Sequence, residues 1–306
     1  MPTPIPNGCT LCPRQCRADR TDRLGFCHAS LSPDVASIAI HRGEEPPISG
    51  ARGVVNLFFA HCNLQCLFCQ NHVISRASVD ADKVFYHSLD EIVNRIAELL
   101  PQTENMLGFV SPSHYAHLIP PILDALHARG LFPTTIYNTN GYDSPDTLRT
   151  LAPYIDIYLP DFKYMDADLA ARYSHAPDYP RRAQEALLEM FSQKGSGLPT
   201  DDNGLAFRGM IVRHLVLPGQ VQNSLDCLRW LADNLSDRIH ISLMAQYFPP
   251  QGVGPLPDQL HRTLLPEEYA RVVQCFNELG FSRGWLQDLS SQSSYRPDFS
   301  QRQSFE

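Results

Sequence analysis

From residue 54 onward, short runs of apolar residues alternate with longer stretches in which apolar residues recur every three or four positions. Short apolar runs are typical of buried strands, and the longer period is typical of amphipathic helices. Strands are predicted at 54–60, 105–110, 134–139, 156–161, 210–217 and 240–246. Helices are predicted at 88–100, 118–129, after 144–145, and at 166–173, 181–193, 225–235 and 266–279.

Six strand-then-helix units predict a parallel sheet with right-handed crossovers. An open doubly wound sheet and a barrel both fit this alternation, and six units favour a partial (β/α)6 TIM-like barrel that is open on one side. Polar residues follow the predicted strands directly, at 62–69, 111–114, 138–141, 161–163 and 246–247. A barrel of this kind places its active site at that end of its strands.

The pattern also divides the chain into three parts. Residues 1–52 are rich in Pro, Gly and Arg and hold four cysteines, which predicts an irregular, cysteine-rich, metal-bound segment. Residues 53–289 form the predicted partial barrel. Residues 290–306 are rich in Ser, Gln and Arg, and we expect a loose C-terminal tail.

Composition narrows the class of protein. The chain has 306 residues, of which 43% are hydrophobic, enough for a full core without disulfide bonds. Its net charge of −8 argues against a general nucleic-acid or membrane-surface binder. No apolar run approaches the roughly 20 residues of a membrane span, and residues 1–6 do not resemble a secretory signal. The expected location is cytoplasmic.

Nine cysteines are present, and seven of them fall in two groups within the first 69 residues. In a reducing compartment, grouped cysteines are typical of metal or cluster sites. Cys227 and Cys275 lie among apolar residues of predicted helices, so we expect them to be buried structural thiols.

The second group, Cys62, Cys66 and Cys69, has the spacing C-x3-C-x2-C and directly follows the first predicted strand of the barrel. Thiolates are the usual ligands of iron–sulfur clusters, and three of them leave one iron of a [4Fe–4S] cluster open to a substrate. The alternative is a zinc site completed by His61 or His72. Zinc sites favour C-x2-C pairs joined by long spacers, so the compact loop predicts a cluster.

This loop resembles the signature of the radical S-adenosylmethionine (SAM) superfamily. The chain is most similar in motif to PflX-like relatives of pyruvate formate-lyase-activating enzyme. The matching stretches run from residue 9 to residue 287 and include 9–16, 41–50, 58–62, 158–164, 212–219 and 242–247.

The resemblance implies an activase-like oxidoreductase with two cofactors, the cluster and SAM. The open iron would hold SAM, whose cleavage would give methionine and a 5′-deoxyadenosyl radical that takes hydrogen from a substrate. A flavodoxin or ferredoxin would donate the electron. The substrate would be a protein or peptide, with a glycyl radical as one product; the alternatives are a small molecule, a cofactor or a nucleic acid. A non-catalytic metal-binding adaptor is the remote alternative, but its cysteine loop would be broken.

The resemblance also assigns SAM contacts after the second and third predicted barrel strands. The residues at these two turns are Ser111, Pro112, Ser113 and His114, then Asn138 and Asn140. The first turn stands where relatives carry Gly-Gly-Glu. Asn138 stands where activases carry an acid that holds a cation, so a cation site is not expected; a plain turn residue is the alternative.

Asp161, Lys163 and Arg213 match residues of activases that lie near SAM. Structural alternatives remain, namely an ion pair between Asp161 and Lys163 and a carboxylate partner for Arg213. Gln246 and Tyr247 can line the substrate space, with a core tyrosine as the alternative. Glu44 and Glu45 precede the first barrel strand and can contact substrate or cap the bottom of the barrel.

The first cysteine group, Cys9, Cys12, Cys16 and Cys27, has the spacing C-x2-C-x3-C-x10-C. Four thiolates complete a tetrahedral zinc site or fully ligate a [4Fe–4S] cluster, and the spacing leaves both open. An iron–sulfur cluster here can relay electrons to the SAM cluster.

Overall fold

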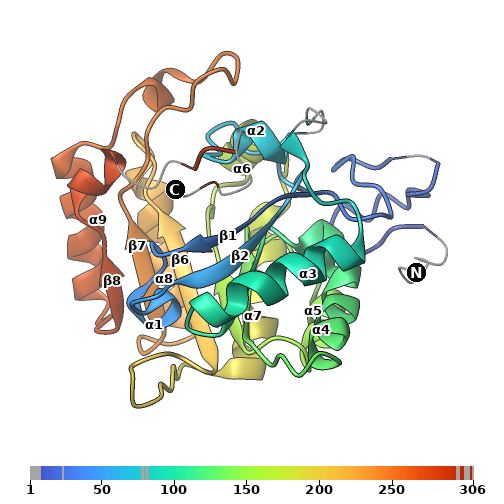
Figure 1. The fold of residues 1–306 in the computed structure, drawn as a ribbon. Coiled ribbons are helices and arrows are strands. Elements are labelled where there is room, and N and C mark those ends of the chain that lie inside the picture. The colour runs from blue at the N-terminus through green and yellow to red at the C-terminus, as the bar shows by residue number, and fades with distance from the viewer. Residues whose placement is uncertain are drawn as a thin grey trace.

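The strands form one open sheet. The computed structural model describes residues 8–22, 24–76, 79, 83–293, 297–299 and 304. In that part of the chain, eight strands follow one another across the sheet in chain order (Figure 1). They are β1 (Val35–His41), β2 (Val54–Phe59), β3 (Met106–Val110), β4 (Thr134–Thr139), β5 (Ile157–Pro160), β6 (Gly209–Leu215), β7 (His240–Met244) and β8 (Gly284–Leu286). β1 pairs antiparallel with β2, and each later pair is parallel.

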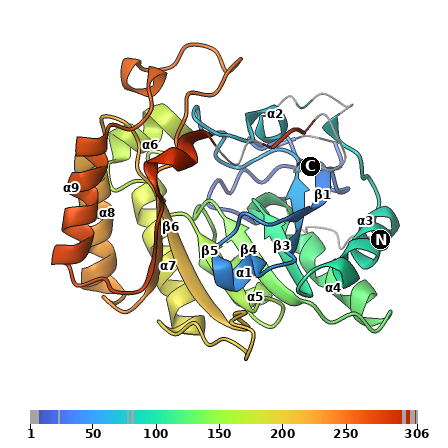
Figure 2. The ribbon, with the colours of Figure 1, turned by 60° about the vertical axis from the view of Figure 1, so that its left-hand side comes forward.

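Helices separate the strands along the chain; the longer helices cover the outer side of the sheet, whereas the short α1 lies at its inner face (Figure 2). They are α1 (Pro46–Ser49), α2 (His72–Ser75), α3 (Leu89–Leu99), α4 (Ile119–His127), α5 (Pro145–Leu151), α6 (Ala167–Ser174), α7 (Tyr179–Lys194), α8 (Val221–Asn234) and α9 (Pro266–Glu278). Short 3₁₀ helices occupy Leu100–Gln102, Ser113–Leu118, Asp258–His261 and Leu289–Ser293. Within the described residues, no helix combines the length and apolarity that crossing a membrane requires.

The predicted partial barrel is confirmed, because β2 to β7 are the six predicted strands in the predicted order. The capping box that begins α3 is present, with Ser88 and Glu91 bonded to each other's backbone. Two edge strands were not predicted. β1 lies in the segment expected to be irregular, whose Pro, Gly and Cys residues obscure a seven-residue strand. β8 has three residues, too few to show a periodicity.

Alternation along the strands divides the core in two, as expected for strands with a period of two. Val55, Leu57 and Phe59 of β2 pack toward the helices in the main core. Val54 points to the inner face and packs in a smaller core with Ile48 of α1. Buried residues from β3 to β6 complete this smaller core: Met106, Ile136, Ile157, Leu159 and Ile211. Apolar residues therefore fill much of the inner face near the amino ends of the strands.

Much of the tail 290–306, which was expected to be loose, lies outside the described residues. Two of its described residues are packed. The ring of Phe299 is buried 5.4 Å from that of Phe58, and the Ser304 hydroxyl lies 2.7 Å from that of Ser37. The tail is therefore not loose at these two positions.

Candidate active site

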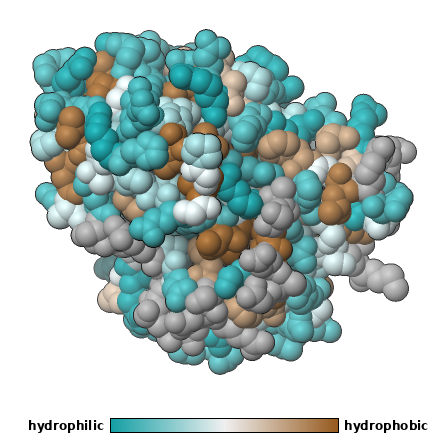
Figure 3. Space-filling view, turned by 90° about the horizontal axis from the view of Figure 1, so that it is seen from above, coloured by the Kyte–Doolittle hydropathy of each residue, from teal (hydrophilic) through white to brown (hydrophobic). Residues whose placement is uncertain are grey.

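A pocket of about 250 Å³ lies where the carboxyl ends of the parallel strands meet. Figure 3 looks down on the molecule from the side of α2, and hydrophobic side chains gather near the middle of that face. The residues predicted from the sequence that line the pocket are Cys62, Cys66, Cys69, Ser111, Asn138, Asn140, Asp161, Lys163, Arg213 and Gln246. The tertiary structure therefore brings residues from six strand ends to one cavity.

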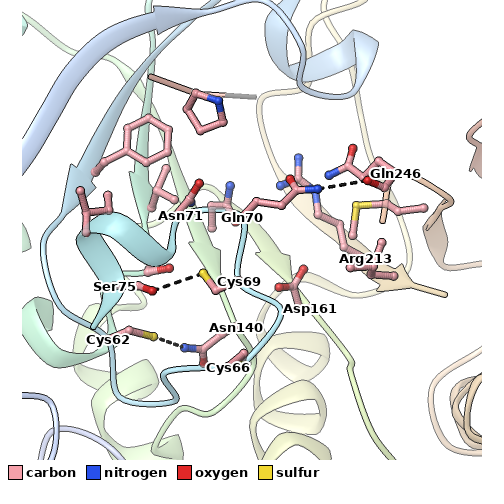
Figure 4. Close-up of a pocket in the computed structure, with 18 of the residues that line it drawn as sticks. Cys62, Cys66, Cys69, Gln70, Asn71, Ser75, Asn140, Asp161, Arg213 and Gln246 are labelled. Atoms are coloured by element: carbon pink, nitrogen blue, oxygen red, sulfur yellow. Dashed lines mark hydrogen bonds between the residues drawn. The ribbon is translucent and has the colours of Figure 1, made fainter. Parts of the chain in front are cut away.

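The three-cysteine loop forms one wall of this pocket (Figure 4). It leaves β2 through His61, whose φ is 67°, and turns again at Gln65, whose φ is 55°. These two left-handed residues turn the chain sharply, the first just before Cys62 and the second just before Cys66. Cys62 and Cys66 are buried, and Cys69 is partly buried. In a [4Fe–4S] cluster each cysteine binds a different iron atom, so three thiols on one wall suit a cluster of this type with one open iron.

Each thiol of the loop accepts a hydrogen bond from a neutral side chain. Asn140 Nδ2 lies 3.4 Å from Cys62 Sγ, and Ser75 Oγ lies 3.3 Å from Cys69 Sγ (Figure 4). Ser174 Oγ lies 3.0 Å from Cys66 Sγ. Hydrogen bonds to sulfur stabilise the thiolate that binds metal and help to set a cluster's reduction potential. Ser75 ends the short helix just after the loop and Ser174 ends α6, far along the chain, and no sequence signal marked either residue.

Burial opposes thiolate formation at this wall. It raises the pKa of Cys66 to about 12 and also raises the pKa of Cys69. The ammonium of Lys163 works against both shifts. Thiols in such a setting stay protonated unless a cation replaces the proton, which is what a metal centre does.

The opposite wall is charged. Arg213 Nε donates to Glu45 Oε1 at 2.9 Å, and its Nη2 donates to both Glu44 and Glu45. All three side chains are at most 11% exposed. Although burial works in the other direction, the two carboxylates hold the pKa of Arg213 well above its usual range. The carboxylate partner that the sequence left open for Arg213 is this pair of glutamates, and all three residues line the pocket.

Asp161 and Lys163 form an ion pair beside this network. Burial lowers the pKa of Lys163, but the carboxylate of Asp161 outweighs it and raises that pKa to about 12. Both side chains also line the pocket. Asp161 and Lys163 therefore form an ion pair with each other and line the pocket at the same time.

The turn after β3 contributes one side chain to the pocket wall. Ser111, with a φ of 51°, lines the pocket, whereas Pro112, Ser113 and His114 are absent from its described lining. Ser113 is buried with its hydroxyl 3.3 Å from that of Thr139. Ser111 is therefore the residue of this turn that lines the pocket, and the SAM contacts expected at the turn stay a prediction.

His114 faces the protein interior. Its Nε2 lies 2.8 Å from the carbonyl oxygen of Ala60, so this nitrogen carries the proton. Burial lowers the pKa of His114 to about 3. The ring is therefore neutral near pH 7, and its hydrogen bond to Ala60 holds the backbone just before Cys62.

Asn138 and Asn140 have different surroundings. Asn138 lines the pocket at the end of β4. Asn140 binds the cysteine loop, since its Nδ2 also donates to Asn63 Oδ1 at 2.7 Å. Gln246 lines the pocket and its carbonyl accepts a hydrogen bond from Gln70 (Figure 4). Tyr247 is a core residue, 1% exposed, and its hydroxyl donates to the carbonyl of Leu260.

The N-terminal cysteines lie outside the pocket lining. Cys9, Cys12 and Cys27 are buried and Cys16 is exposed. Cys227 and Cys275 are buried on α8 and α9, as expected for structural thiols. Among the residues that the structure describes, no group of three or more His, Cys, Asp and Glu side chains has the geometry for a metal ion.

No known family model matches this chain. A relative in Methanocaldococcus jannaschii, the uncharacterized protein MJ0674, is 25% identical over 274 residues, which cover 87% of this chain and 73% of the relative.

Solved structures resemble the fold at low sequence identity. SuiB from Streptococcus suis, bound to its precursor peptide SuiA, has a TM-score of 0.49 and 13% identity over 72% of this chain. The chain spans 44% of the length of SuiB. A domain of pyruvate-formate lyase-activating enzyme from Bacteroides vulgatus has a TM-score of 0.40 and 14% identity, covering 57% of this chain and 92% of that domain.

Proposed function

We propose that this chain is a radical SAM enzyme whose Cys62, Cys66 and Cys69 hold a [4Fe–4S] cluster. The observation that carries the proposal is the cysteine wall, where three thiols from one loop face one pocket and each accepts a hydrogen bond. Among the described lining residues there is no fourth cysteine, which leaves one iron for SAM. When bound, the cluster supplies the electron that breaks the bond between the sulfonium and C5′ of SAM.

The protein's own residues orient and shield the reaction. The charged wall can position a zwitterionic ligand, because Asp161 and Lys163 present both signs of charge beside the cysteines. Ser111 and Asn138 add neutral hydrogen-bonding groups on the same side. Phe58, Phe59 and Phe68 contribute apolar lining. Such lining excludes water, and a radical needs that protection from side reactions.

We propose a peptide or protein segment as the substrate. A second, larger cavity of about 680 Å³ adjoins the first and shares Gln70 and Pro297 with it. Phe248, Pro249 and Leu256 line it, giving an apolar path that leads away from the cysteine wall. A small molecule needs only the inner pocket, whereas an extended segment would occupy both cavities. A flavodoxin or ferredoxin is the proposed electron donor.

The direct test is SAM cleavage without oxygen. The protein would be reconstituted with iron and sulfide, reduced with dithionite, and assayed for 5′-deoxyadenosine. We expect product from the wild type and a loss to background in Cys66→Ala. Cys275→Ala is the matched control, because it removes a cysteine that lies on α9 and not in the pocket lining. If neither spectroscopy nor iron analysis detected a cluster at the loop, the proposal would be wrong.

The substrate class has its own test. Phe248→Ala and Leu256→Ala widen the outer cavity without touching the cysteine wall. For a peptide substrate we expect the turnover of SAM stimulated by substrate to fall, while uncoupled SAM cleavage stays unchanged. If both substrate-stimulated SAM turnover and uncoupled SAM cleavage stayed unchanged, a small molecule held in the inner pocket alone would be favoured.

A further inference from the structure

The carboxyl end of α6 docks on the three-cysteine loop. Ser174, the last residue of α6, donates its hydroxyl to Cys66 Sγ at 3.0 Å. Next to it, the amide of Leu67 donates to the carbonyl of Tyr173 at 2.8 Å. The hydroxyl of Tyr164 lies 2.7 Å from Ser174 Oγ, and because the proton of Ser174 points to the sulfur, Tyr164 is the donor. Two buried hydroxyls in series therefore end on a cysteine of the pocket.

The same helix end carries carbonyl groups that the helix itself cannot satisfy. The chain leaves α6 at His175, whose φ of 52° is left-handed. Arg14 Nη2 donates to the carbonyl of Ser174 at 3.3 Å, and its Nη1 donates to the carbonyl of His175 at 2.6 Å. A cation at this end is also favoured by the helix dipole. Arg14 thus caps α6 from a position 160 residues before Ser174 in the chain.

The remaining nitrogen of this guanidinium binds the loop directly. Arg14 Nε donates to the carbonyl of Asn63 at 3.0 Å, and Asn63 follows Cys62. The guanidinium carbon lies over the ring of Phe26, 3.7 Å from its centre. A planar group with several fixed donors can bridge carbonyls of two segments and stack on a ring at once, whereas the ammonium of a lysine cannot. Arg14 therefore ties the loop to the end of α6.

Arg14 is itself held in place. It lies in the N-terminal cysteine segment, two residues after Cys12. The amide of Gln15 donates to the carbonyl of Cys12 at 3.0 Å, which closes a turn around Arg14. The hydroxyl of Thr147 on α5 donates to the carbonyl of Leu11 at 2.8 Å and fastens this turn to the barrel. The position of the guanidinium thus follows from contacts with the protein alone, whatever metal the segment binds.

We infer that Arg14 is a positioning residue for the three-cysteine loop. By capping α6 and binding the carbonyl of Asn63, it holds the hydroxyl of Ser174 against Cys66. The N-terminal cysteine segment is then a support of the loop and not a separate appendage. The inference rests on the proposed function, in which Cys66 binds the cluster, because contacts just beyond the ligands orient them and tune the metal centre.

The first experiment uses metal-free protein, so that its result does not depend on the cluster. Arg14→Lys keeps the charge and loses the fork of donors. Alkylation of Cys66 by iodoacetamide, followed by mass spectrometry, should become about tenfold faster, the factor that corresponds to one lost hydrogen bond to a charged group. Cys227, which is fully buried on α8, reports global unfolding and should react as in the wild type. An unchanged rate at Cys66, or equal acceleration of Cys66 and Cys227, would overturn the inference.

Arg17→Lys is the matched control, because Arg17 is an exposed arginine of the same segment. Both cysteines should react in this variant as they do in the wild type. If Arg17→Lys accelerated the alkylation of Cys66 as much as Arg14→Lys, the effect would belong to the segment in general, and the role of Arg14 would be wrong.

The second experiment uses protein reconstituted with iron and sulfide. Release of iron to a chelator should be about tenfold faster in Arg14→Lys, the scale typical of lost contacts just beyond metal ligands, and the electron paramagnetic resonance spectrum of the reduced cluster should change. On a Ser174→Ala background the same substitution should have a smaller effect, because both changes act on one contact. Full additivity would overturn the route through Ser174. A wild-type protein without a loop cluster would refute the proposed function, and the alkylation rates would still decide the role of Arg14.

Discussion

The two walls of the pocket satisfy their polar groups in different ways. On the cysteine wall, neutral side chains donate single hydrogen bonds to Cys62, Cys66 and Cys69. On the charged wall, Arg213 is saturated by two carboxylates of the protein itself. The first wall gains most from an added cation, since burial raises the pKa of Cys66 and Cys69 and keeps these two thiols protonated. The second is complete without a ligand.

This difference assigns separate tasks to the walls. A group whose charge changes during the reaction belongs on the cysteine wall, where neutral side chains can adjust to it. The charged wall is a network of paired charges, which gives a fixed surface against which a ligand is positioned. The strand ends supply both sides, the cysteine wall after β2 and the charged wall from the segment before β2 together with β6. The comparison therefore predicts that mutations on the charged wall act mainly on stability and those on the cysteine wall mainly on redox properties.

The largest effect on stability should come from Arg213→Gln. It leaves the carboxylates of Glu44 and Glu45 buried and without their shared cation. Breaking a buried pair in this way costs about 3–5 kcal/mol. Urea unfolding at pH 7 would measure the loss.

Arg52→Gln is the matched control for that variant. It breaks the ion pair with Glu104, in which the arginine side chain is 57% exposed. The expected cost is about 0–1 kcal/mol, because water screens exposed pairs. If Arg213→Gln and Arg52→Gln lowered the free energy of unfolding equally, the charged wall would be no different from an ordinary surface ion pair.

Acid should cause a smaller loss of stability by acting on His114, which lies behind the cysteine wall. Burial depresses the pKa of His114 to about 3, whereas the ring titrates near 6.5 in the unfolded chain. The unfolded state therefore binds more protons than the folded state between these values, so stability falls as the pH falls below about 6.5. Between pH 7 and pH 5 the titration of this ring should lower the free energy of unfolding by about 2 kcal/mol.

Urea unfolding at both pH values, with His114→Gln alongside, would check this prediction. Glutamine can still donate to the carbonyl of Ala60 but does not titrate, so the variant should lose less stability on acidification. His127→Gln, at an exposed position on α4, should behave like the wild type. The same pH dependence in all three proteins would show that acid does not act through His114.

The smallest effect should come from Ser75→Ala, which removes the hydroxyl that donates to Cys69 Sγ. A hydrogen bond worth about 0.5–1.5 kcal/mol stabilises the more negative, reduced cluster, so its loss should lower the midpoint potential by about 20–60 mV. Spectroelectrochemical titration would measure the shift. Ser75→Thr keeps a hydroxyl and should stay close to the wild type. If Ser75→Ala lowered the stability of the protein and left the midpoint potential unchanged, the assignment of redox tuning to the cysteine wall would be wrong.

Periodicity was sufficient to predict β2 to β7 and their helices, because apolar runs and amphipathic stretches are local signals. It missed β1 and β8, where flanking Pro, Gly and Cys residues or shortness conceal the pattern. For the candidate site, the spacing C-x3-C-x2-C identified the cysteine loop. The position after a strand indicated Asp161 and Lys163, the resemblance to activases indicated Arg213, and all three line the pocket. Ser174 was not predicted, because a hydrogen bond to a thiol far away in the sequence leaves no trace in local sequence. Ser75 lies six residues after Cys69, but only the turn of the chain between them directs its hydroxyl to that thiol.

The sequence by itself determined the order of strands and helices, the grouping of cysteines and the end of the sheet where polar residues meet. Only the tertiary structure decided which side chains face the pocket. It placed Ser111 on the wall and turned His114 inward three residues later. It paired Arg213 with Glu44 and Glu45, and it brought Asn140 to the thiol of Cys62. Such choices depend on contacts between segments far apart in the chain, whose distances and directions are fixed when the strands and helices pack together.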